Sequence, residues 1–361
     1  MISSQFTNMK IVGVNAAVPT KKVDAHDYDE IFGAETVDKI IAVTGVRSTY
    51  HAMPEQTSSD LGFAAAKKLI DVFNIDPKTI GVLIFTAAYL DYFVPPSACV
   101  LHHRLGLSQD CIAFDTNLGC SGYVYALQTM CATLHTTNTT RGLLVTGDIT
   151  SKVVSPLDKS RVLFGDGGTA TLIEKCNDSE PIRFGMKTDG RRFKDIIVPA
   201  GAFRNVGASH ERTAWADGNV RSDYDLYMNG PDVFNFTMTD VPKLVKEFME
   251  FYGDEIDNYD NIILHQPNNF ILKHLIKKIK ASLKKMPISL DRYGNTSVCS
   301  IPLTICDTYG DNNADGAQKL FLYGFGVGLS WAIATLTLDT TKVLPISHTD
   351  DYYLDGAVSH G

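Results

Sequence analysis

The sequence has no long apolar run, and its first ten residues, MISSQFTNMK, are polar. A secretory signal peptide needs an apolar core behind a basic start, and a membrane-spanning helix needs about 20 apolar residues in a row. The chain offers neither pattern. We therefore expect a soluble, cytoplasmic protein that has no membrane partner.

An excess of basic charge is also missing. The 361 residues include 33 Lys and Arg against 41 Asp and Glu, so the net charge is −8. Nucleic acids and anionic lipid surfaces attract basic proteins, and this balance argues against both as partners. Because 44% of the residues are hydrophobic, the chain can bury one large core or two of ordinary size.

The cysteines form no metal-binding pattern. There are seven of them, no Cys-x-x-Cys pair occurs, and their spacing from the histidines fits no zinc site. We therefore expect no bound metal. Most cysteines in a reduced globular protein are small buried hydrophobes, so a nucleophilic cysteine must be identified by its local setting.

Short β-branched apolar runs alternate with helical patterns along the chain, which is typical of α/β proteins. Buried strands are expected at 79–88, 111–116, 141–146 and 261–264, and helices at 59–74, 121–134, 238–252 and 269–285. The order of elements is similar in the two halves, which suggests an internal duplication. We divide the chain into halves at 1–175 and 176–340, followed by a polar, loosely packed tail at 341–361.

Cys120 has the setting of a nucleophile. In the segment DTNLGCSGYVYAL, residues 115–127, a buried strand leads into a tight turn and then a helix, with Cys120 in the turn. The free N–H groups and partial positive charge of a helix N-terminus favour thiolate over thiol. Gly119 and Gly122 would allow a substrate to approach the sulfur. The plainer alternative is a buried cysteine at a helix start.

His265 and Asn295 also lie at the ends of predicted elements. His265 ends a buried strand in ILHQPNN, and Asn295 lies in the turn of DRYGNTS. Ligand sites in open α/β sheets gather outside the carboxyl ends of strands. Taken singly, His265 could be a structural histidine and Asn295 a helix-capping residue. Together with Cys120 they match the Cys-His-Asn arrangement of acyl-transfer enzymes.

These motifs in order resemble the 3-oxoacyl-[acyl-carrier-protein] synthase III family, which are condensing enzymes of the thiolase superfamily. The matching segments are TGVR, DTNLGCSGYVYAL, LFGDGG, HQPNN, DRYGNTS and YGFGVGLSW, which span nearly the whole chain. The resemblance implies a thiolase-like α/β fold, in which two duplicated α/β halves pack as five layers in the order αβαβα. It also implies decarboxylative condensation of an acyl group with a malonyl-carrier-protein thioester.

The resemblance assigns the catalytic roles residue by residue. Cys120 would carry the acyl group, while His265 and Asn295 would drive decarboxylation of the malonyl thioester and bind the enolate oxygen. The backbone N–H of Val327, in the turn GVG, would join that of Cys120 in an oxyanion hole.

The resemblance also implies the binding partners and the remaining site residues. Asn268 and Phe234 would be substrate-binding residues, Phe234 near the pantetheine arm. No metal or organic cofactor is implied, because the substrates are thioesters of coenzyme A or acyl-carrier protein. The family forms homodimers, in which the loop matching 91–97 helps to close the partner subunit's acyl pocket.

The chain departs from the family where coenzyme A is usually held by a Trp and an Arg. Lys39 and Val43 occupy the first stretch, and the usual Arg of the second is displaced, with Lys159 and Arg161 nearby. Losing an aromatic ring and a guanidinium removes stacking and phosphate pairing. This difference points to an acyl-carrier protein or an unusual thioester as the first acyl donor.

The predicted helix after His265 is rich in lysine. Its six lysines could dock an acidic carrier protein, or they could form an ordinary solvated face. They are Lys273, Lys277, Lys278, Lys280, Lys284 and Lys285.

Other activities remain open on the same fold. The enzyme could transfer the acyl group to an oxygen or nitrogen acceptor, or condense without decarboxylation using Asp91 as an added base. A silent partner subunit of a larger synthase is a further reading, and the intact Cys120, His265 and Asn295 argue against it.

Overall fold

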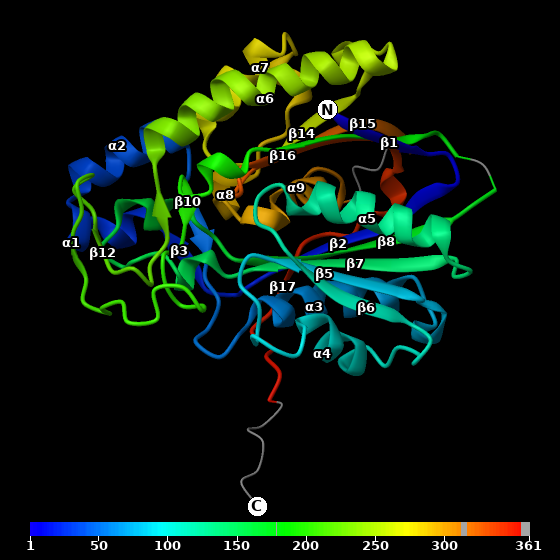
Figure 1. Ribbon diagram of the computed structural model, residues 1–361, viewed down its shortest axis with the longest axis horizontal. Coiled ribbons are helices and arrows are strands. Elements are labelled where there is room, and N and C mark those ends of the chain that lie inside the picture. The colour runs from blue at the N-terminus through cyan, green and yellow to red at the C-terminus, as the bar shows by residue number, and fades with distance from the viewer. Residues whose placement is uncertain (178, 312–315, 355–361) are drawn as a thin grey trace, which may run out of the picture.

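The computed structural model describes residues 1–177, 179–311 and 316–354. Two mixed β-sheets alternate with three helical layers, so the chain has the expected five-layer αβαβα arrangement (Figure 1). Helices α6 and α7 form one outer layer, α5 and α9 lie between the sheets, and α3 and α4 form the other outer layer.

The first sheet has six strands in the order β17-β2-β8-β7-β5-β6. Their bounds are Ser347–His348, Met9–Val18, Gly167–Lys175, Arg141–Asp148, Val82–Ala87 and Ile112–Asn117. All six residues of β5 are buried, as expected for a strand covered on both faces. Helix α3 (Ser58–Val72) begins with a capping box between Thr57 and Asp60, and α4 spans Ser97–Arg104.

The second sheet has five strands in the order β1-β9-β16-β15-β14. They are Ile2–Phe6, Ile182–Thr188, Ser330–Asp339, Ala317–Gly326 and Asn261–Leu264. Helices α6 (Gly230–Tyr252) and α7 (Asn269–Lys278) cover its outer face. Strand β1 therefore belongs to the sheet built mainly by the second half of the chain, and β17 to the sheet of the first.

The middle layer joins the two sheets. It contains α5 (Gly122–Thr136) and α9 (Ser300–Tyr309), and both pack into the hydrophobic cluster that also contains residues of both sheets. The remaining short elements are β3 Lys22–Asp24, β4 Ser48–Tyr50, β10 Ile196–Ile197, β11 Thr213–Ala214, β12 Val220–Arg221, β13 Tyr227–Met228, α1 Asp29–Phe32, α2 Ala34–Thr44 and α8 Leu290–Tyr293. No helix in the described ranges is both long and apolar enough to cross a membrane.

Three expectations about individual elements are wrong. Strand β6 is not buried: it lies at the sheet edge, and Ile112 is 45% exposed. Helix α7 ends at Lys278 instead of residue 285, and Lys280 adopts a left-handed conformation with φ of 59° that ends the helical path. Helix α6 begins at Gly230, eight residues before the expected start, because the Asn229 side chain caps it.

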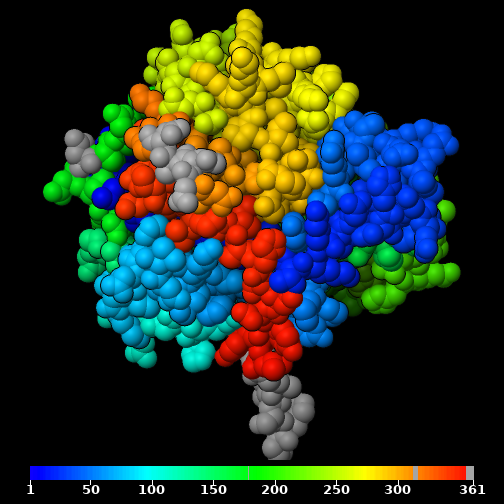
Figure 2. All heavy atoms as spheres, turned by 180° about the vertical axis from the view of Figure 1, so that it is seen from behind, coloured from blue at the N-terminus to red at the C-terminus, as the bar shows by residue number. Residues whose placement is uncertain are grey.

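The C-terminal segment is packed, in contrast to the expected loose tail. Strand β17 pairs with β2, and the buried Gln56 side chain donates to the carbonyl oxygens of Thr349 and Asp351 at 3.0 and 3.1 Å. The Tyr353 N–H donates to the Asp60 carboxylate. Figure 2 shows this segment in red, lying between the blue and light-blue segments of the N-terminal half. Residues 355–361 of the expected tail lie outside the described residues.

Replacing Gln56 with Ala should release the C-terminal segment. Two backbone carbonyls lose their donor and the Met53 N–H loses its acceptor, so unfolding free energy should fall by about 1–3 kcal/mol. Urea unfolding would measure this change, and chymotrypsin cleavage after Tyr352 and Tyr353 should accelerate. Gln318→Ala is the control, with an expected change below about 0.5 kcal/mol. Equal effects of the two substitutions would contradict the role given to Gln56.

Candidate active site

Cys120 lies in the turn between β6 and α5, as predicted. The turn is held by a hydrogen bond from the Gly122 N–H to the Gly119 carbonyl at 2.7 Å. Strand β15 passes directly against the cysteine, since a Cβ atom on Gly326 would lie 2.7 Å from Cys120 Cβ and 2.9 Å from its Sγ. Gly326 has φ of 157°, which also disfavours a side chain there.

His265 follows the last residue of β14 and is buried. Its backbone N–H donates to the Tyr323 carbonyl of β15, which ties the residue to the strand that contacts Cys120. The ring atom Nδ1 lies 2.7 Å from the Ser300 hydroxyl of α9, so Ser300 fixes the orientation of the ring. Burial lowers the pKa of His265 to about 3, which leaves the imidazole neutral at neutral pH.

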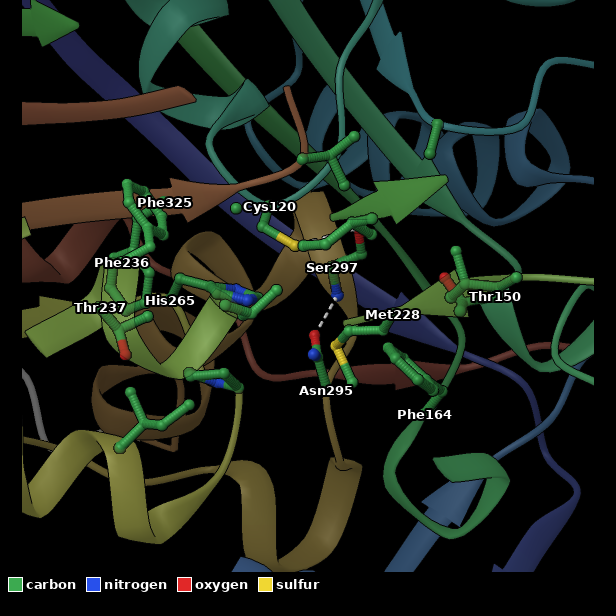
Figure 3. Close-up of a pocket in the computed structure, with 18 of the residues that line it drawn as sticks. Cys120, Thr150, Phe164, Met228, Phe236, Thr237, His265, Asn295, Ser297 and Phe325 are labelled. Carbon is green, nitrogen blue, oxygen red and sulfur yellow. Dashed lines mark hydrogen bonds between the residues drawn. The ribbon is translucent and has the colours of Figure 1, made fainter. Parts of the chain in front are cut away.

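Asn295 lies in the turn between α8 and α9, and its backbone N–H donates to the Leu163 carbonyl at 2.7 Å. Its Oδ1 accepts from the Ser297 N–H at 2.9 Å, which closes a local turn, whereas the N-cap positions of the helices that follow are Thr296 and Cys299. This bond uses the oxygen of the amide and leaves the Nδ2 group as the donor that can face a substrate oxygen. Figure 3 shows Cys120, His265 and Asn295 converging on one pocket.

The backbone of Val327 also reaches the sulfur. Hydrogen bonding from the backbone of Val327 and of Cys120 itself lowers the pKa of the Cys120 thiol. Both groups therefore lie where they can stabilise negative charge beside the sulfur. Their role in an oxyanion hole stays a prediction.

Burial dominates the electrostatics of Cys120. Removal from water, followed by the nearby Asp148 carboxyl, raises the pKa of the thiol to about 11, despite the opposing hydrogen bonds from Ser297, Val327 and Cys120. The expected preference for thiolate at the helix N-terminus is thus outweighed by burial. The resting pair is a thiol and a neutral imidazole.

The pocket in front of Cys120 has a largely apolar wall. Its apolar lining includes Phe164, Ile196, Leu226, Met228, Val233, Phe236, Ile271 and Phe325. Polar groups gather at the end that holds Cys120, His265, Asn295 and Ser297. Such a pocket can hold an apolar acyl chain with its thioester carbonyl against the polar groups.

Two predicted substrate-binding residues lie outside this lining. Phe234 is 37% exposed, and its ring lies tilted against Phe270 with centroids 5.6 Å apart, while its neighbours Val233, Phe236 and Thr237 line the pocket. The Asn268 side chain caps α7 by accepting from the Ile271 N–H at 2.8 Å. Their roles with substrate stay predictions.

Sequence reasoning missed three residues near the nucleophile: Ser297, Ser300 and Asp148. Ser297 and Ser300 follow Asn295 in the same motif, GNTSVCS, and hydroxyls so close to a candidate site residue are the signal that could have found them. Asp148 ends β7, where a carboxylate after a buried apolar run is the only hint. Within the described ranges, no group of three His, Cys, Asp or Glu side chains could hold a metal ion.

The fold and the site together define the class of enzyme. A cysteine with two backbone donors, a neutral histidine and an asparagine around an apolar pocket form the site of a thiolase-like acyl-transfer enzyme. Residues 114–190 match the family model described as 3-oxoacyl-[acyl-carrier-protein] synthase III, and residues 249–338 match the model of its C-terminal part.

Individual proteins of the same family are also similar to this chain. The β-ketoacyl-[acyl-carrier-protein] synthase III of Lactococcus lactis is 32% identical over 338 residues, which cover 92% of this chain and 100% of that protein. A crystal structure of a 3-oxoacyl-(acyl-carrier protein) synthase from Burkholderia xenovorans has a TM-score of 0.91 at 36% identity, covering 96% of this chain and 99% of that one. The chain belongs to the 3-oxoacyl-[acyl-carrier-protein] synthase III family and is a condensing synthase.

Gly326→Ala should disable the nucleophile. Its Cβ would overlap Cys120, and a displacement of about 1 Å can lower the rate of reaction at a positioned group by roughly 10²-fold. Mass-spectrometric measurement of the rate of Cys120 acylation by a small thioester tests this. Gly190→Ala is the matched control, because a Cβ there has nothing within 4 Å. Wild-type rates in folded Gly326→Ala would contradict the close packing.

Proposed function

We propose that this enzyme joins an acyl group held on Cys120 to a malonyl-carrier-protein thioester by decarboxylative Claisen condensation, giving a 3-oxoacyl thioester. The observation that carries the proposal is the convergence of Cys120, His265 and Asn295 on one apolar pocket beside the Val327 backbone. Each residue supplies a different requirement of the reaction.

In the first stage, the Cys120 sulfur attacks the carbonyl carbon of the donor thioester. The tetrahedral intermediate places negative charge on oxygen, and the N–H groups of Cys120 and Val327 stabilise it. Collapse releases the donor thiol and leaves the acyl group on Cys120. The apolar wall of the pocket holds the acyl chain.

In the second stage, His265 and Asn295 bind the thioester oxygen of the malonyl group. Loss of carbon dioxide turns this oxygen into an enolate, and donors aimed at it stabilise that charge. The neutral state of His265 suits the step, since an imidazolium would also pair with the malonyl carboxylate and stabilise the ground state. The enolate carbon then attacks the acyl group on Cys120. No step requires a metal or redox cofactor, so we propose none.

The alternatives have less support. Asp91, the base considered for condensation without decarboxylation, accepts from the Ser59 hydroxyl at 2.5 Å and lines a separate cavity with Asp60 and Arg104. Transfer to an oxygen or nitrogen acceptor and a silent-subunit role have no feature of this site in their favour.

The first acyl donor is better explained as a carrier-bound thioester than as coenzyme A. The Arg161 guanidinium donates to the carbonyls of Ser151 and Val154 at 2.7 and 2.8 Å, so internal bonds hold it. Lys39 pairs with Glu35 in the same helix, and Val43 is exposed without an aromatic ring. These positions offer neither stacking nor a committed phosphate contact.

The lysines on and after α7 form a candidate docking surface for the carrier protein. Lys273, Lys277 and Lys280 are exposed. Lys278 and Lys285 are instead tied to backbone carbonyls of Met238, Asp257 and Tyr259. Exposed lysines beside an acyl pocket in an acidic chain favour an acidic partner.

We further propose a cytoplasmic homodimer that forms through the edge of β6. Edge strands with unpaired backbone groups readily pair with a second chain. Beside this edge, Phe93 and Val94 of the loop after β5 are 73% and 81% exposed, and Phe93 contacts Phe203. All seven cysteines are free, in keeping with a reducing compartment.

Incubation with acetyl, butyryl and octanoyl thioesters of N-acetylcysteamine should give an acyl adduct in the intact mass, and Cys120→Ala should abolish it. His265→Ala and Asn295→Ala should keep the adduct but lower carbon dioxide release from malonyl-carrier protein by at least about 10²-fold, since each removes an enolate donor. Acylation of wild type without decarboxylation would instead favour transfer to another acceptor.

Changing Lys273, Lys277 and Lys280 together to Glu should lower kcat/KM with carrier-protein substrates by at least about tenfold. The change reverses charge where an acidic partner would dock, so the loss should shrink as salt rises. Activity with N-acetylcysteamine thioesters should change less than about twofold. Lys10, Lys22 and Lys67, also exposed, provide a triple Glu control of equal charge. Equal losses on both substrate types would overturn the docking surface.

A further inference from the structure

Ser297 connects all three candidate catalytic residues. Its hydroxyl lies 3.9 Å from the Cys120 sulfur, and its backbone N–H donates to the Asn295 side chain at 2.9 Å. Its carbonyl accepts from the Ser300 hydroxyl, which in turn contacts His265. Ser297 adopts φ of 49°, a left-handed conformation that non-glycine residues seldom take. Figure 3 shows the residue beside Cys120.

Asp148 lies behind this serine and is completely buried at the end of β7. Its Oδ1 accepts from the Thr150 hydroxyl at 2.6 Å, while Oδ2 has no hydrogen-bond partner in the part of the chain that the structure describes. A buried carboxylate oxygen without a partner is costly in free energy, so a native structure that keeps one calls for a reason. The proposed condensation does not yet use this group.

Ser297 begins a short turn, Ser297–Cys299, that packs against the end of β7, where the Thr146 hydroxyl lies 3.2 Å from the Cys299 sulfur. The Ser297 hydroxyl lowers the pKa of both the Cys120 thiol and the Asp148 carboxyl, although neither contact is as short as a formed hydrogen bond in this structure. Burial nevertheless raises the pKa of Asp148 to about 7, so the carboxyl can gain or lose a proton near neutral pH. His265 cannot serve as an efficient base for the thiol, because burial lowers its pKa to about 3.

We propose that Asp148 accepts the proton of the Cys120 thiol through the Ser297 hydroxyl and stores it while Cys120 carries the acyl group. The inference deepens the proposed function and rests on it, since it requires that Cys120 be acylated. Ser297 and Asp148 are then positioning and proton-transfer residues behind the nucleophile. Contacts of this kind often tighten only when substrate binds.

The proton balance closes over one catalytic cycle. During acylation, the thiol proton moves to Ser297 Oγ as the Ser297 hydroxyl proton moves to Asp148 Oδ2, and the sulfur forms its bond to the carbonyl carbon. The bond to the donor sulfur breaks, and that thiolate takes a proton from solvent. During condensation, the enolate carbon displaces the Cys120 thiolate, which recovers the stored proton from Asp148 through Ser297. Carbon dioxide leaves without taking a proton.

Other groups around Asp148 affect its titration. The titratable side chains that face it are Cys120, Tyr89, Asp166 and Cys299, and it raises the pKa of the Tyr89 phenol and the Cys299 thiol. Asp166 raises the pKa of Asp148, and the positive charge of Lys152 acts on Asp166 in the opposite direction. Asp166 is also fully buried, which makes it the natural control.

The test is the pH dependence of single-turnover acylation of Cys120, followed by intact mass with an N-acetylcysteamine thioester that acylates the wild type. The wild-type rate should rise up to about pH 7 and then level off, because Asp148 must be ionised to accept the proton. Asp148→Asn should react about 10²-fold more slowly at pH 7. Its rate should then increase about tenfold per pH unit from pH 7 to 9, following the thiolate alone.

Ser297→Gly provides an independent variant. Glycine accepts the left-handed backbone of this position, so the hydroxyl is removed without added strain. It should show the same loss and the same pH profile as Asp148→Asn, and the double variant should be no slower than either single one. Asp166 accepts hydrogen bonds from Ser151 and the Ala52 N–H, and Asp166→Asn should keep a break in the profile, moved to lower pH because the charge that raises the Asp148 pKa is removed.

Each other outcome counts against the inference. A break near pH 7 that persists in Asp148→Asn or in Ser297→Gly would overturn the proton path. Losses that multiply in the double variant would show two separate effects and would also overturn it. A wild-type enzyme that forms no Cys120 adduct with any thioester would overturn the proposed function itself, and the proton path with it.

Discussion

The site depends on direct contact between the turn that carries Cys120 and strand β15. A Cβ atom on Gly324 would lie 2.9 Å from Ser121 Cα, and one on Gly326 would lie 2.7 Å from Cys120 Cβ. The start of α5, from one half of the chain, therefore touches the sheet of the other half with no side chain between them. Because β15 pairs with β14, which leads into His265, the same contact sets the nucleophile against the imidazole.

This burial acts on the two titratable groups in opposite ways. It keeps His265 neutral, which suits a donor to an enolate, and it keeps Cys120 a thiol, which hinders attack on a thioester. One apolar environment therefore favours the second chemical stage and opposes the first. The Ser297 hydroxyl and the Val327 backbone oppose the burial effect at Cys120, and the Ser297 backbone opposes it at His265, without charging the pocket.

Local sequence was sufficient for the residues whose signal lies within one motif. Cys120, His265 and Asn295 each follow a strand or turn that their neighbours predict, and the structure brings them together. Features that depend on distant partners were missed. The position of Asp148 near Cys120 depends on where β7 ends relative to Ser297. The order of the tail depends on Gln56, and the burial of Cys120 depends on the opposite sheet. The edge position of β6 likewise depends on strand order, which a strand's own residues do not encode.

The catalytic groups and part of the pocket wall come from segments of the chain that differ in regularity. The catalytic groups follow strands β6 and β14 and helix α8, whereas Ile196, Leu226 and Met228 come from the irregular segment between β9 and α6, where β10 and β13 have two residues each. Substitutions in such short elements alter the wall without moving β14 or β15. Relatives at about 32% identity can therefore keep the reacting groups while the shape of the acyl pocket changes. The motifs therefore hold the reacting groups in place, and the irregular segment contributes part of the pocket wall.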